Sequence, residues 1–197
     1  MTSRIPAPQT AVAATLTMMC LIVATPRHVS AADPVQAISP EAQQLVQQLG
    51  AADVFDRQIA FMRLEALREP ATAGVVRQYL TNPDAETRSF SVRALAAIEG
   101  PASIPTLVEM LRSDHEQTVR LAALLAIEPF DDARVVTELI AALRDRHPYV
   151  RMAAVDAVSR IDHPWAKEAI FTRWRREGNR DVRRVLQMTL KRIQDGA

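Results

Sequence analysis

The sequence of 197 residues has one cysteine, Cys20, only five glycines and few aromatic side chains, 5% in all. A single cysteine cannot close a disulfide within the chain, so the fold does not depend on cross-links. Few aromatics argue against a β-sandwich, whereas the many Ala, Leu and Val side chains suit closely packed helices. With so little glycine, the turns are expected to use Asp, Asn and the 12 prolines.

Acidic residues are missing before Asp33, and Arg4 is the only charge before an apolar run from Ala11 to Ala24. This pattern predicts a secretory signal peptide over residues 1–31, cut after Ala31 or Ala32, which would also remove Cys20. The run is shorter than the roughly 20 residues that span a membrane. The mature protein is therefore expected in the periplasm or outside the cell. The alternative is an uncleaved N-terminal segment that anchors it to the inner membrane.

The remaining chain is nearly neutral. Loss of Arg4 and Arg27 leaves 22 basic residues against 23 acidic ones, a net charge of 22 − 23 = −1. A nucleic-acid-binding protein is usually basic. We therefore expect no nucleic-acid partner and, after cleavage, no stable insertion in a membrane.

An internal repeat organises the chain after the predicted signal peptide. Five arginines mark it, and they are separated by 31, 32, 31 and 32 residues: Arg57, Arg88, Arg120, Arg151 and Arg183. Small or apolar residues follow each arginine at positions +2, +3, +7 and +10, which lie on one side of an α-helix. A second apolar helix precedes each arginine. The turn between the two helices carries a residue expected to cap the next helix: Asp53, Asp84, Asp114, Asp145 or Asn179.

Each repeat is thus predicted to be a helical hairpin. The predicted pairs are 41–49 with 54–67, 72–81 with 85–98, 102–112 with 116–128, 133–144 with 148–161, and 164–176 with 180–193. Pro40 and Pro148 fall in first helical turns, where a missing N–H costs no hydrogen bond. We expect a short linker at 32–40 and a single helical domain at 41–195.

Two segments carry a family resemblance: Val119-Arg120-Leu121-Ala122-Ala123 and Val150-Arg151-Met152-Ala153-Ala154. Each follows a Leu-rich helix and an Asp turn, and together with the period they resemble HEAT repeats, in particular the short HEAT-like units of the phycobilisome lyase family. The period of tetratricopeptide repeats is longer, about 34. The resemblance implies an all-α, right-handed α-solenoid of about five hairpins, armadillo/HEAT-like, over residues 41–193. It also implies that the turn Asp and the helix Arg join adjacent hairpins, so the five arginines form a structural ladder.

Candidate catalytic groups are scarce. The mature chain has no cysteine and three histidines, His115, His147 and His163. His115-Glu116 is similar to the His-Glu dipeptides of HEAT-type di-iron hydroxylases, but a metal site needs three or four convergent ligands and the chain offers one such pair. We assign no catalytic residue, metal or cofactor. The sequence favours a non-catalytic scaffold or adaptor, with a lyase-like or cofactor-attachment HEAT-repeat enzyme subunit as the alternative.

Positions +1, +5 and +8 from each ladder arginine are predicted to face away from the core and to line the concave side. Several of them are apolar, and adaptable Met side chains suit a peptide ligand. We predict a partner-binding strip, for another protein or a peptide, at Met62, Leu121, Leu125, Met152, Val155 and Met188. The alternatives are that the strip packs on itself or mediates self-association.

A basic cluster occupies the last repeat. Its members in the predicted patch are Arg173, Arg175, Arg176, Arg180 and Arg184. Such a patch attracts an acidic partner or anionic lipid headgroups. A solvated polar cap on the last repeat is an equally good interpretation.

Overall fold

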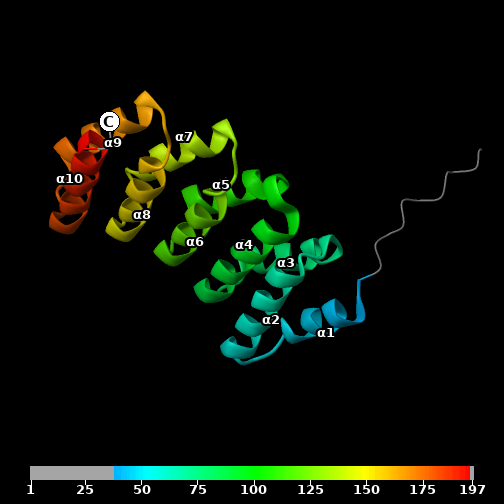
Figure 1. The fold of residues 1–197 in the computed structure, drawn as a ribbon. Coiled ribbons are helices and arrows are strands. Elements are labelled where there is room, and N and C mark those ends of the chain that lie inside the picture. The colour runs from blue at the N-terminus through cyan, green and yellow to red at the C-terminus, as the bar shows by residue number, and fades with distance from the viewer. Residues whose placement is uncertain (1–37, 196–197) are drawn as a thin grey trace, which may run out of the picture. The chain divides into compact units, whose positions relative to one another are not determined.

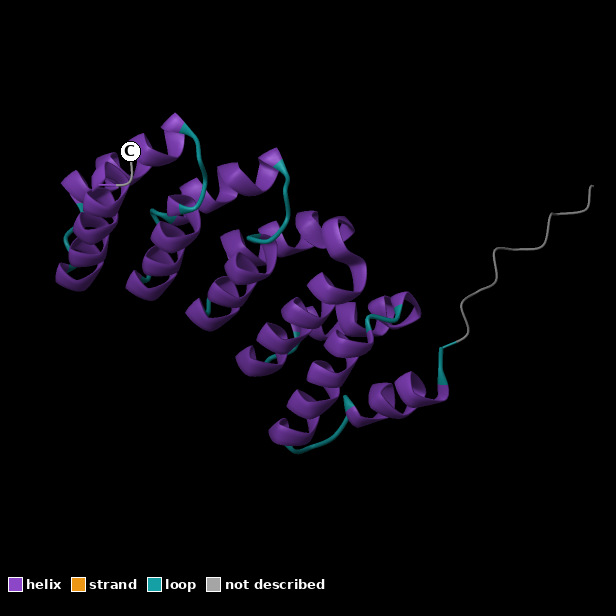
Figure 2. Cartoon of the chain, in the orientation of Figure 1, coloured by secondary structure: helices purple, strands orange, loops and turns teal. Residues whose placement is uncertain are grey.

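The computed structural model describes residues 38–195, which belong to one compact unit. The predicted signal peptide, its cleavage site and most of the linker at 32–40 lie outside these residues. The described part is helical and contains no strand (Figure 1, Figure 2). Its α-helices are α1 (Pro40–Gln48), α2 (Val54–Leu67), α3 (Ala73–Gln78), α4 (Ala85–Glu99), α5 (Ile104–Ser113), α6 (Gln117–Ile127), α7 (Ala133–Ala142), α8 (Pro148–Ser159), α9 (Pro164–Arg176) and α10 (Arg180–Asp195).

The helices form the five predicted hairpins, α1/α2, α3/α4, α5/α6, α7/α8 and α9/α10, with boundaries within a few residues of those expected. The second helices make one layer, in which α2 packs on α4, α4 on α6, α6 on α8 and α8 on α10 (Figure 1). The predicted fold class, an all-α solenoid, is confirmed. One prediction was too regular: the helix expected at 72–81 is divided into η1 (Pro70–Thr72), α3 and η2 (Tyr79–Thr81). Gly74, Val75 and Val76, residues of low helix propensity, stand in α3.

Helix starts follow the expected chemistry. Pro40, Pro148 and Pro164 occupy first turns, where their missing N–H is not needed. Asp53 caps α2 by accepting a hydrogen bond from the backbone N–H of Phe55 at 2.6 Å, and other caps act similarly. Local sequence therefore marks most of the helix starts, although no side chain caps α6.

Gly100 separates α4 from α5. The helical stretch Ala85–Ser113, which includes η3 (Gly100–Ser103), has the length and mean hydropathy, 1.2, of a membrane-spanning helix. However, Gly100 has φ 57°, a conformation that side chains with a Cβ disfavour, and the chain changes direction there. The stretch is thus two helices of consecutive hairpins, joined at a glycine.

The core is built from a few repeated positions. Position +3 from the ladder arginine is buried in every hairpin, and position +4 is buried in the first four, at Phe61, Val92, Leu124 and Val155. The +4 side chain faces the next hairpin, and in the last hairpin this position is the exposed Gln187. Position −1 is buried in the last four hairpins but is the exposed Asp56 in the first. Two positions that are buried inside the stack are thus polar and exposed in an end hairpin, as expected where no further hairpin covers them.

Candidate functional site

The arginine ladder joins consecutive hairpins by paired hydrogen bonds. The Nε and Nη2 atoms of Arg120 donate to the two carboxylate oxygens of Asp145 at 2.8 and 2.9 Å. Arg88 makes the same contacts with Asp114, and Arg151 makes them with Glu177 at 2.9 Å each. In each case the carboxylate belongs to the next hairpin. This two-point geometry suits a planar guanidinium and is the strongest form of side-chain ion pair.

The same guanidinium groups also close their own turns. The Nη1 atom of Arg120 donates to the backbone carbonyls of Asp114 and His115, at 3.0 and 3.1 Å. Arg57, Arg88 and Arg151 contact the corresponding carbonyls, six and five residues before them. One side chain therefore fixes a turn and its distance from the following hairpin.

The turns contain two polar positions where the sequence suggested one. Asp53, Asp84 and Asn179 stand at −4 and cap their helices as expected. The prediction was wrong for Asp114 and Asp145, which stand at −6; the −4 residues there are Glu116 and His147. The −6 carboxylates accept the backbone N–H of the −4 residue, at 2.8 and 2.7 Å, together with the arginine of the preceding hairpin. They are therefore ladder acceptors rather than helix caps.

The ladder weakens at both ends. The second hairpin has Asn82 at position −6 in place of a carboxylate. Arg57 therefore donates a hydrogen bond to Thr87 Oγ1 at 3.3 Å and lies 3.9 Å from the carboxylate of Asp84. Arg183 has no hairpin after it within the described residues, and its guanidinium carbon lies 6.0 Å from the ring centre of Trp174. The three central arginines therefore carry the ladder.

The ladder carboxylates are ionised structural groups. Burial raises the pKa of a carboxyl group. For Glu177 the hydrogen bonds from Arg151, Arg173 and a backbone N–H outweigh burial and hold its pKa at about 2, against an ordinary value of 4.5. The pKa values of Asp114 and Asp145 are also lowered: burial raises them, but the guanidinium hydrogen bonds, a backbone N–H and the nearby positive charges together outweigh burial. Their charges are already balanced inside the stack, which makes them poor binding groups for a ligand.

The predicted partner-binding strip is only partly exposed to solvent. Met62, Leu125 and Met188, all at +5, are 49%, 51% and 64% exposed. Leu121 and Met152, at +1, are half-buried. Val155 is 0% exposed, so its assignment to the strip was wrong. It stands at +4, about 40° around the helix from the ladder arginine, and therefore faces the next hairpin as that arginine does.

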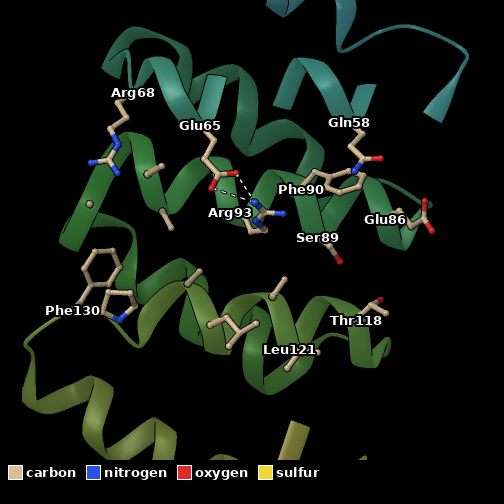
Figure 3. Close-up of a pocket in the computed structure, with 17 residues that line it drawn as sticks. Gln58, Glu65, Arg68, Glu86, Ser89, Phe90, Arg93, Thr118, Leu121 and Phe130 are labelled. Atoms are coloured by element: carbon tan, nitrogen blue, oxygen red, sulfur yellow. Dashed lines mark hydrogen bonds and ion pairs between the residues drawn. The ribbon is translucent and has the colours of Figure 1, made fainter. Parts of the chain in front are cut away.

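Two residues of the strip, Leu121 and Leu125, line a groove of about 920 Å³ bounded by α2, α4 and α6 (Figure 3). Met62, Met152 and Met188 lie outside it. Seven of its lining residues stand at the +1, +5 and +8 positions that the sequence predicted to face outward: Gln58, Glu65, Ser89, Arg93, Ala96, Leu121 and Leu125. The strip is thus replaced by a more local site within the first three hairpins.

Small side chains between α4 and α6 create the groove. The residues that α4 and α6 contribute to the groove include four small ones, Ser89, Ala96, Ala122 and Ala126, which leave space between the two helices. Sequence reasoning treated Phe90, Ala122 and Phe130 as core. It missed seven other lining residues: Arg68, Glu86, Ala97, Gly100, Thr118, Ala126 and Pro129. The four small residues of these two repeats are visible in the sequence. Their role could not be predicted from it, because the sequence does not show which positions of neighbouring hairpins face each other.

Charged residues are distributed unevenly along the groove. Arg93 of α4 crosses its centre and pairs with Glu65 of α2, Nη2 to Oε2 at 3.1 Å. Arg68 lies at the end near Phe130, where the three helices finish (Figure 3). Glu86 lies at the opposite end, where α4 begins (Figure 3). The groove therefore has an apolar wall from α6, a neutralised centre and oppositely charged ends.

The basic patch expected in the last hairpin is not one surface. Arg173 donates to Glu177 at 3.0 and 2.6 Å and so supports the ladder. Arg175 lies over the ring of Phe171, 6.0 Å from its centre. Arg176 lines a hollow with Trp165, whereas Arg180 and Arg184 line another at the start of α10. Helices α9 and α10 belong to different layers, which separates arginines that are close in sequence.

The histidines have local roles. The Nδ1 atoms of His147 and His163 accept the backbone N–H groups of Tyr149 and Trp165, at 3.4 and 3.2 Å, at the starts of α8 and α9. The side chain of His115 is 74% exposed. Between residues 38 and 195 no three His, Cys, Asp or Glu side chains are grouped to hold a metal ion.

Comparisons with known proteins agree with this architecture. The family model of HEAT repeats matches residues 42–128 and 119–191. Among solved structures, the complex of CpcE and CpcF of phycocyanin lyase from Nostoc sp. PCC7120 is similar with a TM-score of 0.58 and 20% sequence identity, over 75% of this chain and 96% of that chain. No curated protein matches the sequence. The resemblance predicted from the repeat pattern is confirmed, and the likeness to the solved structure concerns the fold.

Proposed function

Since this chain belongs to the family of HEAT repeat proteins, we propose that it is a non-catalytic scaffold that binds a segment of a partner protein in the groove bounded by α2, α4 and α6, outside the cytoplasm. One observation carries the proposal: Leu125 is 51% exposed on the largely apolar wall that α6 contributes to the groove. An exposed apolar surface with a polar rim is typical of interaction sites. The paired contact of Arg88 with Asp114 ties the hairpins of α4 and α6 together, so this part of the groove is formed before a partner arrives.

The chemistry of the groove favours binding over catalysis. Active sites bring ionisable groups together and perturb their pKa values. In this groove Arg93 is neutralised by Glu65, and Arg68 and Glu86 lie at opposite ends. Such an arrangement supports recognition of an extended surface, with apolar contacts for affinity and charges for orientation.

Two variants at the same repeat position test the site. Leu125 and Met188 both stand at +5 and both are exposed, so replacing either with Lys leaves the core intact. We expect Leu125→Lys to abolish capture of the partner from the exported fraction and Met188→Lys to leave it unchanged. Equal capture by both variants would remove the groove from the proposal. A changed sedimentation coefficient of purified Leu125→Lys protein would instead indicate self-association through the groove.

The location outside the cytoplasm rests on the pattern of residues 1–31. The mass of the protein purified from the exported fraction tests it, with the expected N-terminus at Ala32 or Asp33. An intact N-terminus in a membrane fraction would support the anchored alternative.

A second candidate is a lyase-like or cofactor-attachment subunit. The groove volume, about 920 Å³, lies within the range of small-molecule pockets, and the fold is similar to that of the phycocyanin lyase complex. Native mass spectrometry of the isolated protein separates the two candidates. A bound small molecule that is lost in Leu125→Lys supports the second, whereas a bound protein that is lost in the same variant supports the scaffold.

A further inference from the structure

Arg68 adopts a backbone conformation that arginine disfavours. It follows α2 with φ 52° and ψ 36°, and it is the one non-glycine residue with positive φ in the described part of the chain. Its backbone N–H donates to the carbonyl of Leu64 at 3.0 Å and closes the last turn of the helix. Glycine is the usual residue at this position, because a Cβ is strained there. The fold alone would therefore favour Gly over Arg.

The side chain of Arg68 lies at one end of the groove. It is exposed and extends toward the region of Phe130 (Figure 3). Among residues 38–195 its guanidinium has neither an ion pair nor a hydrogen bond, in contrast to the first four ladder arginines. The position equivalent to Arg68 in the second hairpin is Glu99, which accepts a hydrogen bond from Arg77 at 2.8 Å. A cation without a partner thus stands where three helices end.

The two ends of the groove therefore differ, both in charge and in whether the helices begin or end there. Helices α2, α4 and α6 end near Arg68, and α4 and α6 begin near Glu86 and Thr118 (Figure 3). Leu121 and Leu125 lie one helical turn apart on the wall between these ends. The eleven residues of α6 extend about 16 Å, the length of a three-turn helix.

We propose that the groove binds an amphipathic helix of the partner protein, antiparallel to α4 and α6, with an acidic residue of its first turn against Arg68. This inference rests on the proposed function. Acidic residues are favoured in the first turn of a helix and basic ones in the last, so such a ligand places its acid at Arg68 and its base at Glu86. The dipole of an antiparallel helix also opposes those of α4 and α6. Apolar side chains spaced i, i+3, i+4 and i+7 would contact Leu121 and Leu125.

Two peptides of about fourteen residues with one composition test the direction. One has Glu in its first turn, Leu at the i, i+3, i+4 and i+7 spacing, and Lys in its last turn; the other exchanges Glu and Lys. Fluorescence anisotropy should show that the first binds about tenfold more tightly, a preference that decreases with added salt. Equal binding, tighter binding of the exchanged peptide, or no binding of either would overturn the inference. So would equal binding of a variant of the first peptide made non-helical by central prolines.

The variant Arg68→Gly separates binding from folding. Because Gly is unstrained in the left-handed conformation, its thermal unfolding midpoint should be equal to or above that of the wild type. Its affinity for the Glu-first peptide should fall about tenfold, as expected for loss of a charge-assisted hydrogen bond. Arg68→Lys should retain most of the affinity, and Arg184→Ala, with the same loss of charge outside the groove, should retain all of it.

Two patterns of failure are distinct. If Leu125→Lys prevents partner capture but Arg68→Gly binds the Glu-first peptide like the wild type, the directional inference is wrong and the groove remains the binding site. If Leu125→Lys leaves partner capture unchanged, the proposed function fails as well.

Discussion

Arg120 offers the most direct test of what holds the solenoid together. It is 2% exposed and ranks first among the large, fully buried side chains. Its guanidinium makes four hydrogen bonds, two with the carboxylate of Asp145 and two with backbone carbonyls of its own turn. The variant Arg120→Ala removes all four and leaves the carboxylate of Asp145, whose side chain is 9% exposed, without its cation.

The expected loss in the free energy of unfolding is about 3 kcal/mol. Removing one partner of a buried ion pair typically costs about 3–5 kcal/mol. The lower end applies because Arg146 Nη2 also donates to the carbonyls of Asp114 and His115, and Asp145 still accepts the N–H of His147. A domain is stable by about 5–15 kcal/mol, so the loss is easily measured.

Urea denaturation followed by circular dichroism provides the measurement, with Arg57→Ala as the matched control. Arg57 makes three hydrogen bonds, to Thr87 and to two carbonyls of its own turn, but lies 3.9 Å from Asp84, so its removal leaves no buried carboxylate without a cation. At about 0.5 kcal/mol for each of these partly exposed hydrogen bonds, the loss should be about 1.5 kcal/mol. The double variant Arg120→Ala/Asp145→Asn should recover part of the loss, because a buried amide replaces an orphaned charge. Equal losses for Arg120→Ala and Arg57→Ala, or no recovery in the double variant, would refute the assignment of the ladder as the main tie between hairpins.

Three further predictions concern pH, the turn at Gly100 and the ends of the stack. Glu177 has a pKa of about 2 in the folded protein against an ordinary value of 4.5, so the unfolded chain binds this proton first as the pH falls. The stability that Glu177 contributes at neutral pH should therefore be lost between pH 4.5 and 2. In acid titrations followed by circular dichroism, Glu177→Gln should make this loss of stability smaller. Gly100→Ala should lower the free energy of unfolding by about 1 kcal/mol, measured in urea, because of its φ of 57°, although no atom blocks a Cβ there; an unchanged value would contradict the strain argument. Leu124→Ala should cost about 2–5 kcal/mol, whereas Gln187→Ala, at the equivalent position, should cost little in the same assay; similar losses would show that the last hairpin is not an end cap.

The hairpins were predictable because local signals encode them. Apolar spacing, first-turn prolines and capping residues act within a few residues of one another, and the steady separation of the ladder arginines supplied the register. That register also predicted the positions +1, +5 and +8 as a binding face, and seven of the residues that line the groove stand at these positions.

Contacts between hairpins were less predictable. The sequence treats Asp84 and Asp114 alike, as acidic residues in a turn, although one caps a helix and the other accepts the preceding arginine. A difference of two residues, −4 against −6, decides between these roles. Val155 was misplaced for a related reason: an α-helix in a solenoid contacts its own hairpin partner and the next hairpin, so its apolar side is wider than the stripe that one contact requires.

The ladder and the groove use different positions of the same helices. Arg88 and Arg120 pair with the following hairpin near the starts of α4 and α6, whereas the groove runs along both helices, from Glu86 and Thr118 to Arg68 and Phe130. The paired hydrogen bonds set the spacing of the hairpins at one end, and the small side chains between α4 and α6 then decide how much space remains along their length. A lost ladder contact should therefore act on binding only through the fraction of folded protein, whereas a changed groove residue should alter the affinity of protein that remains folded.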